Sequence, residues 1–295
     1  MAYFCMFFSL FTLPLYILLL CVLFKRRSQL KSTFFILFIS AGLSDVWLII
    51  HKTLLINIPR MAYASELLHN HFMATLAKAG IWYIYFVQVL GVFLMTLNRF
   101  TALVTPSKFK QLWSVKTLAI SIVLQWTLPL PFLFPMLHEC CRSHYSELFY
   151  PVFNDPMTHK IYFTIDLILE PGIFATSFLF MYVLMIYKIV AFRKNKVAAE
   201  NSRKSGQTAN AHHVRKAEAQ LALTGVLIVS VYMLLCVTYV WNYFEPTHQT
   251  PQYLFLYGND IFTVVNPWAL LIFSPSVREK MLDFLFCYNE NDDWD

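Results

Sequence analysis

The sequence predicts an all-α membrane protein, a bundle of seven transmembrane helices with its N-terminus outside the cell. Hydrophobic residues make up 58% of the chain and charged residues only 14%, whereas soluble domains are about half apolar and about a quarter charged. Long apolar segments recur along the whole sequence, and the basic residues between them collect on one side. A bilayer is the solvent that accommodates so much apolar surface.

Each apolar segment is long enough to cross the hydrocarbon core, which takes roughly 20 residues of helix. None alternates with the period of two that a barrel strand requires, so helices are expected throughout. The expected spans cover residues 3–24, 33–55, 77–97, 117–137, 161–192, 220–244 and 253–273.

The spans differ in how clearly hydropathy delimits them. The first, second, third and sixth stand out, and the first stops at the basic run Lys25-Arg26-Arg27. The fourth is rich in proline, with Pro129, Pro131 and Pro135. The seventh includes polar residues, so its ends, like those of the fourth, are less sharply defined.

Orientation follows from the basic residues. If the N-terminus is outside, all but five of the 23 lysines and arginines fall on the inner side, and inner loops are the ones that accumulate such residues. The net charge of +6 therefore reflects membrane topology, and no nucleic-acid partner is expected. The five outer residues are Lys52, Arg60, Lys78, Arg142 and Lys160.

The bundle is expected to occupy residues 1–275, and residues 276–295 form a separate C-terminal segment. Val277, Met281 and Leu285 recur at helical spacing, which predicts an amphipathic helix on the inner lipid surface, followed by an acidic tail. Cys287 ends this helix. It is either a palmitoylation site or a buried free thiol.

The clearest functional motif lies at the inner end of the third span, where Asn98-Arg99-Phe100 is followed by Pro106. There the arginine is placed to face a partner in the cytosol. The segment resembles the D-R-Y-x-x-x-x-x-P motif of rhodopsin-like receptors, whose arginine engages a heterotrimeric G protein. Alternatively, the arginine has no coupling role and lies there because basic residues accumulate at the inner ends of membrane helices.

Two further motifs lie at mid-membrane. Asp45 in the second span costs at least about 2.5–3.5 kcal/mol to insert, so it should face the bundle and have a partner. Asn266-Pro267 in the seventh span allows a kink, and Asn266 can bond to Asp45 across the bundle. These residues resemble the helix-two aspartate and the N-P-x-x-Y motif of the same receptors. The aspartate is either a sodium site or a structural hydrogen-bonding group.

Polar and aromatic residues in the outer half of the bundle are candidates for a ligand pocket. Intramembrane acids mark functional sites, and aromatic faces suit a cationic or flat ligand. Alternatively, Lys78 neutralises one acid and the others are protonated or hydrated. The candidates are Trp82, Tyr85, Phe86, Asp166, Glu170 and Asp260.

Three longer segments extend the resemblance over essentially the whole chain: FFILFISAGLSDVW, LNRFTALVTPSKFKQLW and NPWALLIFSPSVREK. They resemble nematode serpentine chemoreceptors of the Srg superfamily, in its gamma or V class. The resemblance implies a G-protein-coupled receptor in the plasma membrane of sensory cilia, with a small environmental molecule, a heterotrimeric G protein and membrane lipid as its partners.

The chain departs from the rhodopsin-like pattern at several switch positions. Asn98 replaces the acid that would pair with Arg99, and Leu270 stands where the tyrosine of N-P-x-x-Y would be. Ala74 replaces the cysteine that would tether the outer end of helix three, so the usual disulfide to the second outer loop cannot form. These departures affect the switching mechanism more than the fold.

Other classes of protein fit less well. No enzyme motif is complete, no cofactor is expected, and His212-His213 lacks the spaced histidine boxes of a di-iron enzyme. The alternative function is a seven-span ligand-gated channel or a small-solute transporter. A ligand-gated odorant channel has its N-terminus inside, and a carrier is expected to have paired broken helices and matched acids, which the sequence lacks.

Overall fold

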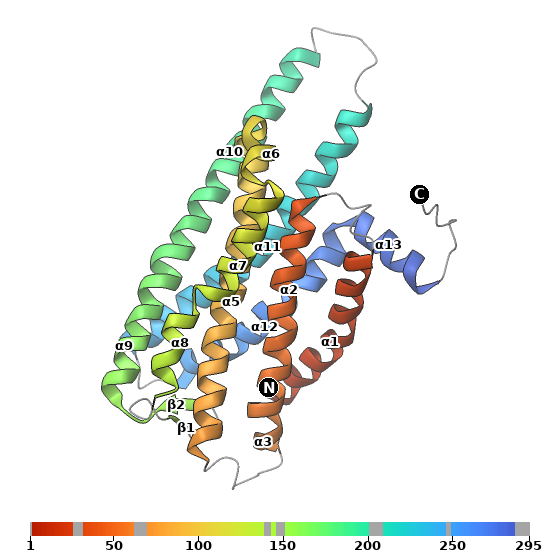
Figure 1. Ribbon diagram of the computed structural model, residues 1–295. Coiled ribbons are helices and arrows are strands. Elements are labelled where there is room, and N and C mark those ends of the chain that lie inside the picture. The colour runs from red at the N-terminus through yellow and green to blue at the C-terminus, as the bar shows by residue number, and fades with distance from the viewer. Residues whose placement is uncertain are drawn as a thin grey trace.

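The computed structural model describes residues 2–25, 32–61, 70–138, 143–145, 151–200, 209–245 and 249–286. Within these ranges the chain is almost entirely helical, and the helices form one bundle (Figure 1). Among the described residues, six helical segments are long and apolar enough to cross a membrane. A seventh is reached if Tyr257–Phe273 and Val277–Leu285, bent by 93°, count as one span. The predicted seven-helix class is confirmed.

The first three spans are formed by α1, α2 and α5. Helix α1 covers Ala2–Lys25. Helix α2 covers Thr33–Lys52 and continues through the π-helix η1 (Thr53–Asn57) into α3 (Ile58–Met61). Helix α5 covers His71–Val104, well beyond the expected residues 77–97 at both ends. It starts at Asn70, whose side chain accepts hydrogen bonds from the backbone N–H groups of the first turn.

The fourth span is broken where the prolines predicted uncertain boundaries. Helix α6 (Pro106–Leu112) leads into α7 (Val115–Thr127), which stops before Pro129, and α8 (Leu130–Met136) follows. Only 17% of the fourth span is buried, against 67% of α5. Helix α5 is therefore the central helix, and α7 with α8 lies at the lipid-facing edge.

A short β-hairpin precedes the fifth span and was not expected from the sequence. Its strands β1 (Ser143–Tyr145) and β2 (Pro151–Phe153) are antiparallel, with His144 opposite Val152. The hairpin, α3 and the start of α9 lie at one end of the bundle, while α6 and α13 lie at the other (Figure 1). We call these the hairpin end and the arginine end.

The fifth span contains a π-helix. Helix α9 (Pro156–Leu167) passes into η3 (Ile168–Ala175) and then into α10 (Thr176–Glu200). Pro171 lies inside η3. A proline in a helix interior removes one backbone donor and clashes with the preceding turn, which the wider π-helix relieves. Glu170, the residue before this proline, is only 3% exposed.

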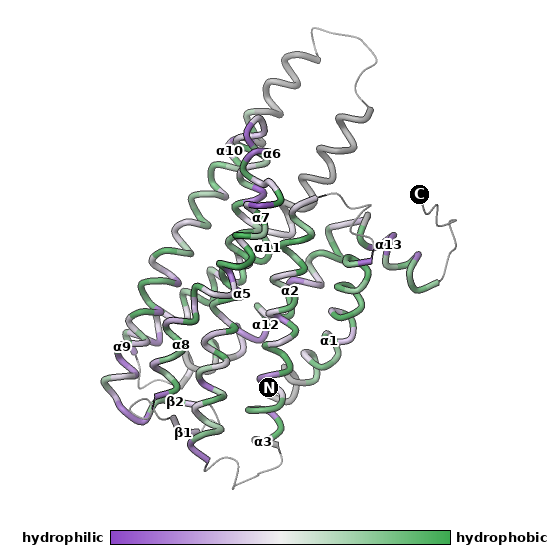
Figure 2. Tube along the Cα trace, in the orientation of Figure 1, coloured by the Kyte–Doolittle hydropathy of each residue, from purple (hydrophilic) through white to green (hydrophobic). Residues whose placement is uncertain are grey.

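The last two spans are α11 (Ala209–Phe244) and α12 (Gln249–Phe273), which pack along one another. Helix α12 continues through Pro267 and also contacts α1 and α2. Helix α13 (Pro275–Leu285) then turns away, and Arg278 donates hydrogen bonds to the carbonyls of Leu271 and Ile272 at the end of α12. Figure 2 shows polar residues gathered near the bundle ends, in α6, α9 and α13.

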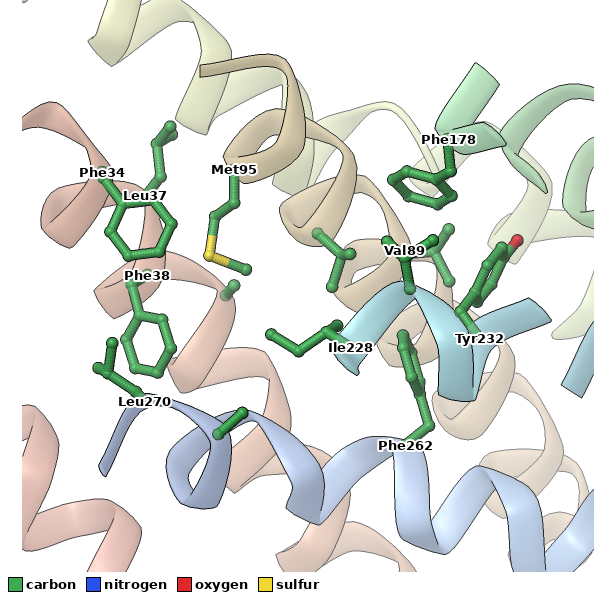
Figure 3. Close-up of a cluster of buried hydrophobic side chains, with 14 of the residues drawn as sticks. Phe34, Leu37, Phe38, Val89, Met95, Phe178, Ile228, Tyr232, Phe262 and Leu270 are labelled. Atoms are coloured by element: carbon green, nitrogen blue, oxygen red, sulfur yellow. The ribbon is translucent and has the colours of Figure 1, made fainter. Parts of the chain in front are cut away.

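The core is a continuous cluster of large side chains between α1, α2, α5, α10, α11 and α12. Within it Phe178 packs edge to face with Tyr232, and Tyr232 packs at a tilt against Phe262; the three rings are drawn in Figure 3. Many other apolar side chains remain exposed on the outside of the bundle, including Phe180 at 63% and Leu234 at 68%. This is the pattern expected when lipid covers the outer surface.

Candidate functional site

The middle of the bundle contains a carboxylate shared by three helices. Asp45 of α2 is fully buried. Its Oδ2 accepts a hydrogen bond from the Nδ2 of Asn266 on α12, at 2.7 Å, and another from the hydroxyl of Tyr16 on α1. The bond between Asp45 and Asn266 is the one expected from the sequence. Tyr16 was not foreseen, because a tyrosine in an apolar segment carries no signal of its own.

Several buried polar atoms around this carboxylate have no hydrogen-bond partner among the described residues. They are Asp45 Oδ1, both amide atoms of Gln88 and Asn266 Oδ1. Gln88 lies close enough to Asp45 to act on its carboxylate. Buried polar atoms are almost always paired, with ordered water if not with protein. The cluster therefore has the chemistry of a hydrated site, and its oxygens suit a small hard cation.

A cluster of three or more His, Cys, Asp or Glu side chains able to hold a metal is absent from the described part of the chain. Any cation at Asp45 therefore relies on one carboxylate and neutral oxygen atoms. Such a ligand set fits a weakly held monovalent ion better than a structural divalent metal.

The end of α5 brings the predicted Asn98-Arg99 pair against the start of α2. Asn98 Nδ2 donates to Thr33 Oγ1 at 2.8 Å, and the Arg99 guanidinium lies over the ring of Phe34, 4.0 Å from its centroid. Asn98 and Arg99 are 1% and 5% exposed. The motif is thus packed inside the arginine end of the bundle, not displayed on its surface.

A small cavity adjoins the arginine. Its wall is formed by α2, α5, α10 and α11, and it includes the side chains of Arg99, Thr96, Tyr182 and Thr224. Of the other residues of this motif, Phe100 is partly buried against the core, and Pro106 begins α6 directly after α5 ends.

At the hairpin end, the candidate pocket residues of α5 meet those of the fifth span. Trp82 Nε1 donates to Asp166 Oδ1 at 2.8 Å, and the Tyr85 hydroxyl donates to Glu170 Oε2 at 3.3 Å. The Phe86 ring lies 4.4 Å from that of Trp82. Five of the six predicted residues therefore form one aromatic and acidic cluster, in which Glu170 is buried and Asp166 is partly buried.

The second-span and sixth-span helices add two contacts that the sequence did not indicate. The Tyr239 hydroxyl of α11 donates to Asp166 Oδ2 at 3.2 Å. Asp260, the sixth predicted residue, instead forms an ion pair with Lys52 of α2. Asp260 is therefore neutralised by Lys52. Lys78, the lysine that the sequence offered as a partner for one of the acids, lies close enough to Asp166 to interact with its carboxylate.

The hairpin is attached to the bundle by non-covalent contacts close to the position where a tethering cysteine is missing. Ala74 is fully buried. Beside it, the Thr75 hydroxyl accepts a hydrogen bond from the Ser143 backbone N–H at 3.1 Å. The Tyr145 hydroxyl donates to the Leu55 carbonyl at 2.6 Å, and Lys78 Nζ lies 5.4 Å from the centre of the Phe153 ring. The predicted lipidation site, Cys287, lies outside the described residues.

A seven-helix membrane bundle with a buried acid on its second helix, an arginine at the end of its third and Asn-Pro in its seventh has the architecture of a serpentine receptor. A family model described as serpentine type 7TM GPCR chemoreceptor Srv matches residues 4–287, and the chain belongs to that family. The chain is also 25% identical over 279 residues to "Serpentine receptor class V-1" of Caenorhabditis elegans, covering 92% of this chain and 85% of that protein.

Of the two classes that the sequence resembled, gamma and V, these matches identify class V. The family is one of chemoreceptors and not of enzymes, so the chain is assigned a chemosensory receptor role.

Proposed function

We propose that this receptor binds a small environmental molecule at the hairpin end of the bundle and activates a heterotrimeric G protein at the arginine end. The observation that carries the proposal is Arg99, held at the end of the central helix beside a cavity that four helices line. Movement of any of these helices changes the surroundings of the arginine, which is the coupling that a receptor needs.

The proposal includes an orientation. The N-terminus and the hairpin face outside, and the arginine end faces the cytosol, in keeping with the excess of lysine and arginine on that side. The plasma membrane is the proposed location, and the family likeness extends this to sensory cilia.

The proposed ligand site is the cluster of Trp82, Tyr85, Phe86, Asp166 and Glu170. One buried and one partly buried carboxylate among aromatic rings favour a cationic or polar small molecule. Asp260 is a weaker candidate for direct contact, since Lys52 already neutralises it. If Asp166→Asn left the potency of an activating amine unchanged, this ligand class would be wrong.

The polar cluster at Asp45 is proposed to hold water and, at cellular concentration, a sodium ion. The unpaired oxygens of Asp45 and its neighbours support this role. A thermal unfolding midpoint of the purified receptor that rises with sodium more than with potassium or choline would support it. A rise of the same size in all three salts would indicate a structural hydrogen-bonded cluster.

The coupling is tested by basal nucleotide exchange, which needs no ligand. Membranes containing the wild-type receptor, Arg99→Ala or Lys160→Ala are mixed with purified G protein, and uptake of a non-hydrolysable GTP analogue is followed. Arg99→Ala should change the basal rate. Lys160→Ala, which removes the same charge at the other end of the bundle, should not.

Orientation is tested separately with epitope tags at the two termini, probed with and without permeabilisation. An exposed N-terminal tag and a hidden C-terminal tag are expected. An N-terminus inside the cell would place Arg99 on the wrong side of the membrane and favour the channel alternative.

A further inference from the structure

The restraint on Arg99 in the resting state needs a different source from the acidic neighbour found in rhodopsin-like receptors. The residue before Arg99 is Asn98, which is neutral and cannot form an ion pair with it. Yet Arg99 is only 5% exposed and is packed in one place, so other contacts must hold it. The start of α2 supplies one contact to Arg99 and one to its neighbour Asn98.

Two consecutive residues of α5 contact two consecutive residues of α2. Asn98 donates a hydrogen bond to the Thr33 hydroxyl at 2.8 Å, and the Arg99 guanidinium covers the Phe34 ring at 4.0 Å. A cation over an aromatic face within about 6 Å is attracted by the ring quadrupole, and the attraction strengthens when both groups are removed from water. Both groups here are buried.

The Phe34 ring is itself fixed in orientation. Phe35 packs against it edge to face, with the ring centroids 5.6 Å apart, and Phe38 lies one turn further along α2 at 6.3 Å. Figure 3 shows Phe34 and Phe38 side by side along α2, with Met95 of α5 across from them. A ring held by its neighbours presents its face to the arginine without a further loss of side-chain freedom.

We propose that Thr33 and Phe34 form a clasp that holds Asn98 and Arg99 in the resting conformation of a receptor whose arginine follows a neutral residue. The inference rests on the proposed coupling of Arg99 to a G protein. Thr33 and Phe34 are positioning residues, since they act through the arginine. Phe34 and Arg99 both line the small cavity beside them, so the contact lies between the helices that would have to move.

A cation–π contact has a signature that simple packing lacks. Fluorine atoms added stepwise to a phenylalanine ring weaken the negative potential of its face while changing its shape little. Replacement of Phe34 by mono-, di- and trifluorinated phenylalanine should therefore weaken the clasp in steps. The matched control is the same series at Phe178, a fully buried ring that packs on Phe93 and Tyr232.

Two quantities are measured on the full-length receptor: basal nucleotide exchange by the G protein, and thermal unfolding of the purified receptor without G protein. Across the Phe34 series we expect basal exchange to rise in steps, by about 5- to 30-fold in total, and the unfolding midpoint to fall in the same order. The Phe178 series should show no such order. Thr33→Val should act in the same direction as fluorination, and Thr33→Ser should restore the wild-type values.

The proposal is overturned if exchange and midpoint are flat across the Phe34 series, or if they follow the Phe178 series. A graded fall in midpoint with undetectable exchange in every variant and in the wild type has a different meaning. The contact would then stand, and the proposed G-protein coupling would fail.

Discussion

The ion pair between Lys52 and Asp260 joins α2 to α12 and gives the most quantitative test of the bundle. The side chains are 13% and 26% exposed, so the pair lies between a surface salt bridge and a buried one. Exposed pairs contribute about 0.2–1 kcal/mol, whereas removal of one partner from a buried pair costs about 3–5 kcal/mol. We therefore expect a coupling free energy of about 1–3 kcal/mol between the two residues.

A more exposed ion pair in the same chain serves as the control for this coupling free energy. Lys280 and Asp283 are separated by 4.0 Å on one helix, with side chains 30% and 32% exposed. Pairs of this kind contribute about 0.2–0.5 kcal/mol.

The assay is a pair of double-mutant cycles on the purified receptor. Lys52→Met, Asp260→Asn and their combination form one cycle, and Lys280→Met, Asp283→Asn and their combination form the other. Free energies of unfolding are measured in mixed detergent micelles at low salt and at about 1 M salt, where exposed pairs are screened most strongly. The reasoning is refuted if the first coupling energy is no larger than the second, or if salt abolishes both alike.

Three further predictions concern close contacts. A Cβ at Gly225 would lie 2.2 Å from the Tyr182 hydroxyl oxygen but 3.4 Å from the ring carbon that carries this hydroxyl. Gly225→Ala should therefore lower the free energy of unfolding by about 1–3 kcal/mol. Tyr182→Phe, which removes the clashing oxygen, should restore most of that loss when it is added to Gly225→Ala. Tyr16→Phe removes a donor from a buried carboxylate and should cost about 1–3 kcal/mol, whereas an unchanged unfolding free energy would mean that water replaces the hydroxyl. Thr75→Val removes the acceptor of the Ser143 amide, whose hydrogen exchange should become up to about 10-fold faster, and an unchanged rate would mean that the hairpin is held by its other contacts.

The seven-helix class could be predicted because the signal for a membrane helix is local. About 20 apolar residues in a row have few other solutions, so each expected span lies largely within one or more helices of the structure. The prolines of the fourth span predicted only uncertain boundaries, and the structure breaks the helix at one of them, Pro129. The hairpin could not, because its short strands are stabilised by contacts with Thr75 and Leu55, which are distant in sequence.

The contacts of the candidate site also include some that the sequence predicted and others that it could not predict. Asp45 and Asn266 were predicted to meet because a buried acid demands a donor and few polar residues face it. Trp82 and Asp166 were both identified as candidates, but their hydrogen bond depends on how α5 and α9 are rotated towards each other. Lys52 gave no indication of its partner, since hydropathy places a lysine near a helix end without specifying which helix it faces.

The length of the central helix has a consequence for how the receptor fits its bilayer. Helix α5 has 34 residues, which at about 1.5 Å per residue is about 51 Å. A tilt of 40°, at the upper end of the range for membrane helices, still leaves it spanning about 39 Å against about 30 Å of hydrocarbon. The helix must therefore emerge from the lipid tails at one end or both. Arg99 is five residues before the last residue of the helix, so local membrane thickness decides whether its guanidinium is level with lipid tails or with headgroups. In a thicker bilayer the guanidinium would lie nearer the level of the lipid tails, and in a thinner bilayer it would lie nearer the level of the headgroups. Lipid thickness is thus expected to tune how readily Arg99 moves.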